Sequence, residues 1–135
     1  MNYFLAKTDP ETYSIEDFKK EELTVWSGVR NPQAVMVLKS MKKGDRVFIY
    51  HSGGERSIRG LAEVVGTSRP DPKDTKSWLV DFKCRYIYNE PYITIKDMRS
   101  EKALADFALL RQSRLSTMEV PTTVVQWLKK KGIQV

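Results

Sequence analysis

Hydrophobic and polar residues recur along the chain with two different periods, one typical of strands and one typical of helices. Short apolar or alternating runs predict strands at residues 3–7, 46–50, 57–65, 78–88, 92–95 and 116–120. Apolar residues spaced three to four positions apart predict helices after Ser14, at 32–41, at 101–110 and from Thr122 or Thr123 to Gly132. Five or six short strands with helices inserted between them predict an α+β protein with a curved sheet or a small barrel.

The starts of two expected helices carry capping signals. Ser14, followed three residues later by Asp17, resembles a capping box. Asn31 is a natural N-cap, and Pro32 suits the first helical position, where the missing N–H would have had no partner. Both helices are therefore expected to begin at these residues.

The stretches between the strands are short, and they contain no repeat or low-complexity tract. Residues 52–56 predict a flexible loop, residues 69–74 predict a turn with two prolines, and Gly60 marks a bulge. A chain of 135 residues has the size of one domain, so we expect residues 1–135 to form a single domain.

Composition excludes several classes of protein. The apolar start at residues 3–7 has no basic stretch before it and is expected to be a buried strand instead of a signal peptide. No apolar run approaches the ~20 residues of a membrane span. A single cysteine, Cys84, allows no internal disulfide and favours a reducing compartment, most simply the cytoplasm.

Cofactor and metal signals are absent from the sequence. One histidine and one cysteine, far apart, give no metal-ligand pattern. The chain has neither a P-loop nor a G-x-G-x-x-G fingerprint, so no cofactor is expected. Cys84 lies in the middle of an expected strand, where a packed thiol is a simpler interpretation than a reactive one.

The formal net charge is +6 and the pI is about 9.4. A positive balance favours polyanions through phosphate contacts and counterion release. A basic protein without a special partner fits the net charge equally well. Part of the excess lies at residues 129–131, where it complements the dipole of the last helix.

The most informative polar cluster surrounds Gly28. Trp26, Ser27, Arg30 and Asn31 gather just before an expected helix, and Trp26 offers a flat face for stacking. Two later segments, 50–54 and 110–116, have the same mixed character. Together they could hold a planar, hydrogen-bonding group such as a nucleobase. The alternatives are that Trp26 belongs to the core and that the arginines of 110–116 are solvated.

These segments resemble the EVE domain, a branch of the PUA-like superfamily. The similar motifs run through the whole chain: Tyr3 to Pro10, Tyr13-Ser14-x-x-Asp17, Trp26 to Ala34, Met41 to Asp45, Tyr50-His51-Ser52, Gly60 to Val64, Pro70-Asp71-Pro72 and Leu109 to Ser116. Three positions depart from the family pattern. Ser27 stands where an acidic residue is common, Pro32 where an aromatic is common, and Val35 in place of a frequent arginine.

The resemblance implies a PUA-like fold, a small and strongly curved β-barrel with helices around it. It also implies relatedness to YTH domains, which hold a methylated adenine in an aromatic cage. EVE domains are regarded as readers of modified bases in DNA or RNA. The expected partner is therefore DNA or RNA carrying a modified base.

A non-catalytic binding module of this kind assigns roles to the polar residues. Trp26, with Tyr50, would stack on a base. Base edges would be contacted by Ser27, Asn31, His51 and Ser52. Phosphates would be contacted, or the pocket oriented, by Lys7, Arg30, Arg111 and Arg114, with Ser116 beside them in the cleft.

A second hypothesis keeps the same pocket but gives it another use. The protein would be an enzyme, or a binder of a small metabolite or free nucleotide, with His51 as the acid or base. The sequence pairs His51 with no cysteine or carboxylate in a motif, and it has no nucleophile elbow. Binding of mononucleosides compared with methylated oligonucleotides separates the two hypotheses.

Overall fold

A computed structural model describes all residues 1–135. The elements follow in the order β1 (Tyr3–Thr8), α1 (Ile15–Glu21), β2 (Leu23–Trp26), α2 (Pro32–Ser40), β3 (Arg46–His51), β4 (Ser57–Val64), β5 (Arg69–Asp71), β6 (Asp74–Ile87), β7 (Ile93–Thr94), α3 (Ile95–Arg99), the 3-10 turn η1 (Lys102–Leu104), α4 (Ala108–Arg111), β8 (Thr117–Glu119) and α5 (Thr122–Lys130).

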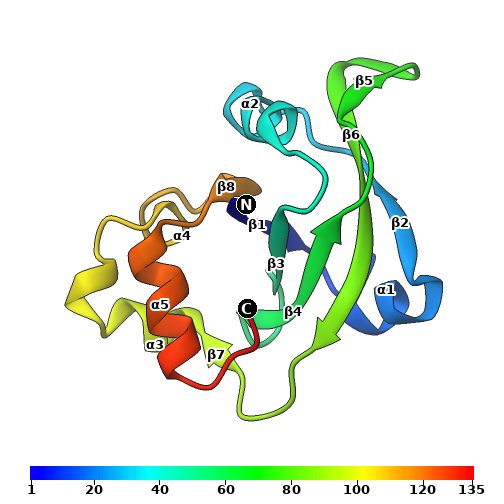
Figure 1. The fold of residues 1–135 in the computed structure, drawn as a ribbon. Coiled ribbons are helices and arrows are strands. Elements are labelled where there is room, and N and C mark those ends of the chain that lie inside the picture. The colour runs from blue at the N-terminus through cyan, green and yellow to red at the C-terminus, as the bar shows by residue number, and fades with distance from the viewer.

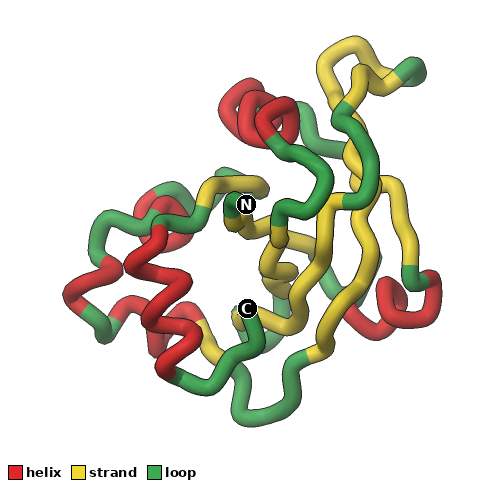
Figure 2. The backbone as a smooth tube through the Cα atoms, in the orientation of Figure 1, coloured by secondary structure: helices red, strands yellow, loops and turns green.

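One curled sheet organises the molecule (Figure 1). Its strands lie in the order β2-β6-β4-β3-β1-β8, with β5 paired to β6 and β7 paired to β4. The pair β1–β3 is parallel and the other pairs are antiparallel. Helices lie around the outside of the sheet in Figure 2. The prediction of an α+β protein with a strongly curved sheet of five or six main strands is confirmed.

The two predicted helix caps are present. The Ser14 hydroxyl accepts the Asp17 N–H at 3.1 Å, and the Ser14 N–H donates to the Asp17 carboxylate at 2.9 Å. Asn31 Oδ1 accepts the N–H groups of Gln33 and Ala34 at 2.9 and 3.1 Å. These bonds satisfy free donors at the starts of α1 and α2, so both helices begin where the sequence predicts.

Gly60, in β4, lies directly against Ile15 of α1 and Tyr86 of β6. A Cβ at this position would be 2.5 Å from Ile15 Cδ1 and 2.8 Å from the Tyr86 carbonyl oxygen. The register between β3 and β4 shifts beside it, with Ile49 opposite Gly60 and Tyr50 opposite Ile58. The bulge predicted at Gly60 is therefore one residue earlier in β4.

Three sequence predictions of local structure are corrected. Residues 69–74, predicted as a turn, form β5 and the start of β6, a hairpin that projects from the sheet (Figure 1). The helix predicted at 101–110 is broken into η1 and α4, with α3 before them. The N-cap of α5 is Pro121, which provides no side-chain cap, instead of Thr122 or Thr123.

Strand β2 is an element that the sequence analysis did not predict. Its four residues pair with β6 from Leu23 opposite Lys83 to Trp26 opposite Val80. Four residues beside a polar loop give too short an alternation to read as a strand. This strand matters because it fixes Trp26 against the sheet.

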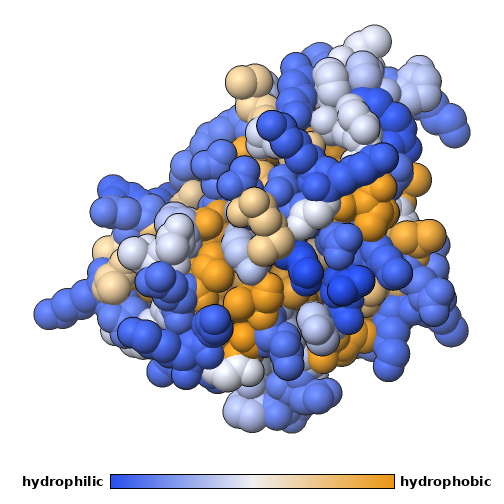
Figure 3. Space-filling view, in the orientation of Figure 1, coloured by the Kyte–Doolittle hydropathy of each residue, from blue (hydrophilic) through white to orange (hydrophobic).

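The surface and the core have opposite characters. On the face drawn in Figure 3, hydrophilic residues cover most of the surface and hydrophobic ones gather toward its middle. Buried side chains from the sheet and from every α-helix form one hydrophobic core. None of the helices has the length and apolar content that crossing a membrane requires.

Candidate nucleic-acid interface

A pocket of about 580 Å³ opens between the end of β1, the loop before α1, and β2 with the loop that follows it. It is lined by Lys7, Thr8, Asp9, Thr12, Tyr13, Glu21, Thr24, Val25, Trp26, Ser27, Gly28, Val29 and Ser116. Four of the predicted site residues are in this lining: Lys7, Trp26, Ser27 and Ser116. We call it the aromatic pocket.

Trp26 is both a core residue and a wall of the aromatic pocket. Its side chain is 8% exposed. The indole ring packs on the Phe82 ring with centroids 5.2 Å apart, and the Phe18 ring lies 6.4 Å away. Trp26 is therefore a packed residue, as the alternative interpretation has it, and it also lines a cavity.

Tyr13 is the aromatic residue of the pocket to which the sequence analysis gave no role. Its ring meets the Trp26 ring edge-on, with an interplanar angle of 75° and centroids 6.2 Å apart. Its hydroxyl donates to the Glu21 carboxylate. Burial, followed by the bond to Glu21, raises the pKa of Tyr13 to about 12. The hydroxyl therefore stays protonated, and its bond to Glu21 anchors a ring that lines the pocket.

Lys7 joins the aromatic pocket to the loop before β8. Its Nζ donates to the Ser113 carbonyl oxygen at 2.9 Å. Burial, followed by repulsion from Arg56, lowers the pKa of Lys7. Ser52, predicted to contact a base edge, instead bonds through its N–H to the Thr8 carbonyl at 3.0 Å and is not in the lining.

Three other predicted residues gather in a second hollow of about 290 Å³. Asn31, Arg111 and Arg114 line it together with Gln33, Gln112, Ser113 and Leu115. We call it the arginine pocket. Arg111 Nη1 forms an ion pair with Asp106 Oδ1 at 2.8 Å, in which both side chains are mostly exposed. Such a pair contributes little to stability, so Arg111 is available to an anion.

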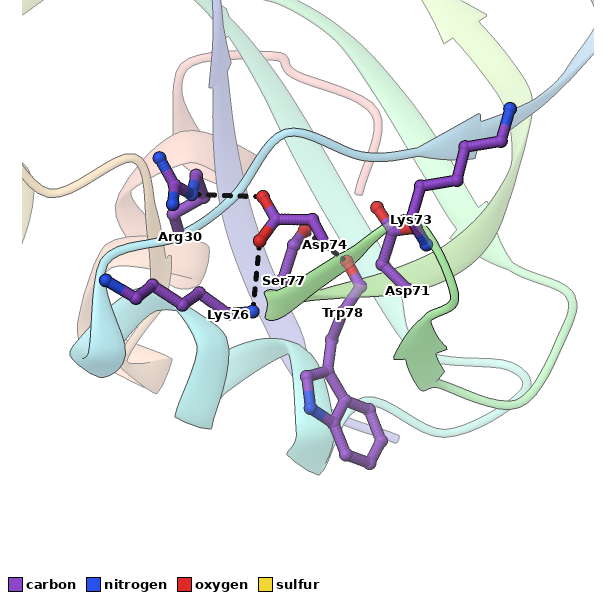
Figure 4. A network of polar contacts seen from close by, with 7 residues as sticks. All are labelled: Arg30, Asp71, Lys73, Asp74, Lys76, Ser77 and Trp78. Carbon is purple, nitrogen blue, oxygen red and sulfur yellow. Dashed lines mark hydrogen bonds and ion pairs between the residues drawn. The ribbon is translucent and has the colours of Figure 1, made fainter.

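Arg30 lies in the segment between the two pockets. Its Nε forms an ion pair with Asp74 Oδ2 at 3.0 Å, shown in Figure 4. Asp74 belongs to the start of β6, in the projecting hairpin. The structure therefore connects the pocket loop to the hairpin, which the sequence analysis did not anticipate.

Tyr50 and His51 are not part of either pocket, and their predicted place beside Trp26 is corrected. Tyr50 is 2% exposed and His51 is 3% exposed, because β3 is covered on both faces. His51 Nε2 accepts the Ile15 N–H at 3.0 Å, at the start of α1. Burial raises the pKa of Tyr50. Both side chains are held inside the fold, although their backbones pair with Lys7 and Thr8 of the pocket lining.

His51 gives the stability of the fold a testable pH dependence. Burial, followed by repulsion from Arg59, lowers the pKa of His51 below its ordinary value of 6.5. The unfolded chain binds the proton more readily, so the free energy of unfolding falls as the pH drops below about 6.5.

We expect His51→Gln to flatten this dependence, since the amide oxygen of glutamine can accept the same N–H. Thermal unfolding measured between about pH 7.5 and 5 checks this expectation. The chain has no other histidine, so no second imidazole contributes. Equal pH dependence in the variant and the wild type would contradict it.

The titratable groups elsewhere give no centre for metal or thiol chemistry. No group of three or more His, Cys, Asp or Glu side chains is arranged to hold a metal ion. Cys84 is half-buried, and burial raises the pKa of its thiol. The thiol therefore stays protonated and weakly nucleophilic.

Comparisons with known proteins agree with this fold. A family model described as the EVE domain matches residues 2–131. Human thymocyte nuclear protein 1 is 39% identical over an alignment of 82 positions that covers 52% of this chain. The match covers 36% of that protein, so the chain spans only about a third of its length.

Two solved structures are similar over nearly the whole chain. The structure of Rpa0253 from Rhodopseudomonas palustris has a TM-score of 0.89 and 33% identity, covering 98% of this chain and 93% of that one. Human THYN1 protein, solved in complex with 5-methylcytosine-containing DNA, has a TM-score of 0.88 and 23% identity. The alignment with human THYN1 covers 100% of this chain and 99% of the THYN1 chain. The predicted PUA-like fold is confirmed by these matches.

Proposed function

Because this chain belongs to the EVE domain family, we propose that it is a non-catalytic nucleic-acid-binding module that reads a modified base. The supporting observation is the aromatic pocket, in which the Trp26 and Tyr13 rings meet edge-on beside the cation of Lys7. The human relative solved with 5-methylcytosine-containing DNA makes a methylated cytosine the first base to test.

The chemistry of the aromatic pocket suits an unpaired base. An aromatic ring offers a stacking face, and polar groups around it can bond to the base edge. Thr12, Thr24 and Ser27 supply hydroxyls that both donate and accept, while Glu21 supplies an acceptor. A base flipped out of a strand would therefore find a flat surface and an edge lined by both kinds of hydrogen-bonding group.

The pocket also suits the binding of a nucleic acid better than it suits catalysis with His51 as the acid or base. An acid or base must reach the substrate directly or through one water. His51 was the candidate for this role, and its Nε2 is bonded to the Ile15 N–H inside the fold. The residues that line the pocket offer rings for stacking on a base, hydrogen-bonding groups for its edge and a cation for phosphate charge, which are the tasks of a binding site.

A binding panel tests the proposal. The probes are mononucleosides and short single-stranded DNA and RNA oligonucleotides that carry cytosine, 5-methylcytosine or N6-methyladenine. We expect one modified oligonucleotide to bind more tightly than its unmodified counterpart. The affinity should fall as salt is raised. A plot of log K against the logarithm of the salt concentration should have a negative slope of ~0.7 for each phosphate contact of a single strand. Tight, salt-independent binding of a free nucleoside would instead favour the small-molecule hypothesis.

Tyr13 provides the mutational test of the stacking surface. We expect Tyr13→Ala to weaken binding of the preferred oligonucleotide roughly tenfold, since a base–aromatic stack contributes about 1–3 kcal/mol. Tyr13→Phe keeps the ring and removes only the bond to Glu21, so it should bind more tightly than the alanine variant. Equal binding by the wild type and Tyr13→Ala would remove Tyr13 from the site.

A further inference from the structure

The two pockets are lined by adjacent parts of the same two chain segments. Residues 27–29 line the aromatic pocket, and Asn31 and Gln33 line the arginine pocket. On the opposite side, Ser116 lines the first pocket and residues 111–115 line the second. The bond from Lys7 to Ser113 spans the boundary between them. The hollows are therefore neighbours along two continuous segments of chain.

Arg30 lies at the boundary with most of its donors free. The Asp74 carboxylate uses one oxygen to hold Arg30 Nε and the other to accept the Lys76 N–H, each at 3.0 Å. The two terminal nitrogens of Arg30 donate no hydrogen bond to the protein, and its ion pair with Asp74 is made through Nε. Figure 4 shows the Arg30 and Lys76 side chains extending to the same side of Asp74.

An ion pair at Nε leaves the two terminal nitrogens of the planar guanidinium as a fork, the geometry that suits phosphate oxygens. The Arg30 side chain is 60% exposed and that of Asp74 is 31% exposed, so the fork is open to solvent. Arg114, across the arginine pocket, is exposed and takes part in none of the ion pairs. The boundary thus presents cations with unused donors.

We propose that the arginine pocket receives the phosphodiester next to the base held in the aromatic pocket, and that Asp74 is the positioning residue that aims Arg30 at it. This inference rests on the proposed function and extends it. It makes the projecting β5–β6 hairpin a part of the nucleic-acid interface, although the hairpin lines neither pocket.

The direction in which Asp74→Asn changes the affinity separates positioning of Arg30 from simple attraction of the strand by net charge. Asp74→Asn removes a negative charge, so attraction of the strand by net charge alone would tighten binding. If Asp74 positions Arg30, the same substitution frees a long side chain that binding must then immobilise. We expect it to weaken binding of a single-stranded oligonucleotide roughly fivefold.

Asp71→Asn is the matched control. Asp71 lies on the same hairpin and bonds the Lys73 N–H, without contact to Arg30. It makes the same charge change, so we expect binding that is unchanged or slightly tighter. Weaker binding in both variants would show that the hairpin acts only through its own folding, and would overturn the proposal.

A double substitution isolates the pair. In an Arg30→Ala background, Asp74→Asn should no longer weaken binding, because its effect passes through Arg30. Arg30→Ala alone should reduce the salt slope by ~0.7 if it removes one phosphate contact. An equal loss from Asp74→Asn with and without Arg30 would contradict positioning, and thermal unfolding of each variant monitors its fold.

The probe set separates this inference from the proposed function. The probes are 5-methyl-2′-deoxycytidine and a single-stranded DNA nonamer with one central 5-methylcytosine. If the nonamer binds no better than the nucleoside, the arginine pocket is not a phosphate site while the base pocket stands. If the wild type binds neither these probes nor any member of the panel, both proposals fail together.

Discussion

Replacing Trp26 with alanine is expected to lower the free energy of unfolding by about 3–5 kcal/mol, the range for large buried aromatic side chains. The reason is the 8% exposure of the indole and its packing against Phe18, Phe82 and Tyr13. Removing the ring leaves a cavity beside these three aromatic rings, and the surrounding structure can collapse into it only in part. Chemical denaturation followed by circular dichroism measures the loss.

Trp26→Phe is the companion variant, since it keeps an aromatic ring in the same wall. We expect it to lose clearly less stability than the alanine variant, and to remain folded enough for binding assays. A loss below about 1 kcal/mol in Trp26→Ala would show that the ring is not part of the core. Trp26→Ala tests the packing of the ring in the core. The Tyr13 variants and Trp26→Phe test the role of the aromatic pocket in binding.

A methyl group at Gly60 is expected to cost about 1–3 kcal/mol of stability, the usual range for overpacking. In Gly60→Ala the new Cβ would lie 2.8 Å from the Tyr86 carbonyl oxygen and 2.5 Å from Ile15 Cδ1. The Ile15 methyl can rotate away, whereas the carbonyl belongs to β6 and moves only with the strand. Relief of this contact requires β4 and β6 to separate locally, and thermal unfolding measures the cost.

Gly53 supplies the control for this substitution. A Cβ there would have the Asp9 and Pro10 side chains as its nearest neighbours, at 3.6 Å, and Gly53 is not among the glycines with positive φ. Gly53→Ala should therefore change stability by no more than about 0.5 kcal/mol. Equal losses at the two glycines would show that the close approach to β6 does not explain the effect at Gly60.

Local signals predicted most of the fold because they act within a few residues. The Ser14–Asp17 capping box, the Asn31 cap and the apolar runs of β1, β3 and β4 depend on hydrogen bonds and burial that their own sequence specifies. The elements that were missed depend on distant partners. Strand β2 is a strand because β6 pairs with it, and Pro70 is in a strand because Trp78 lies opposite.

The candidate site divides in the same way. Trp26, Ser27, Lys7 and Ser116 were predicted together and meet at one pocket. His51 was misplaced because the sequence shows that it follows an apolar strand but not that Ile15 lies against it. Tyr13 and Asp74 were assigned no role for a related reason, since each acts through a residue far away in the sequence. Ring angles and ion pairs arise only from folding.

The place of β1 in the sheet has a consequence for synthesis of the chain. This first strand lies between β3 and β8, so its two neighbours emerge from the ribosome well after it does. The bond from Lys7 to Ser113 joins residues 106 positions apart, and such non-local closure forms slowly. A nascent or truncated chain without β8 lacks the wall that Ser116 supplies. The aromatic pocket is thus complete only once the chain has been synthesised beyond residue 116, long after its other walls have been made.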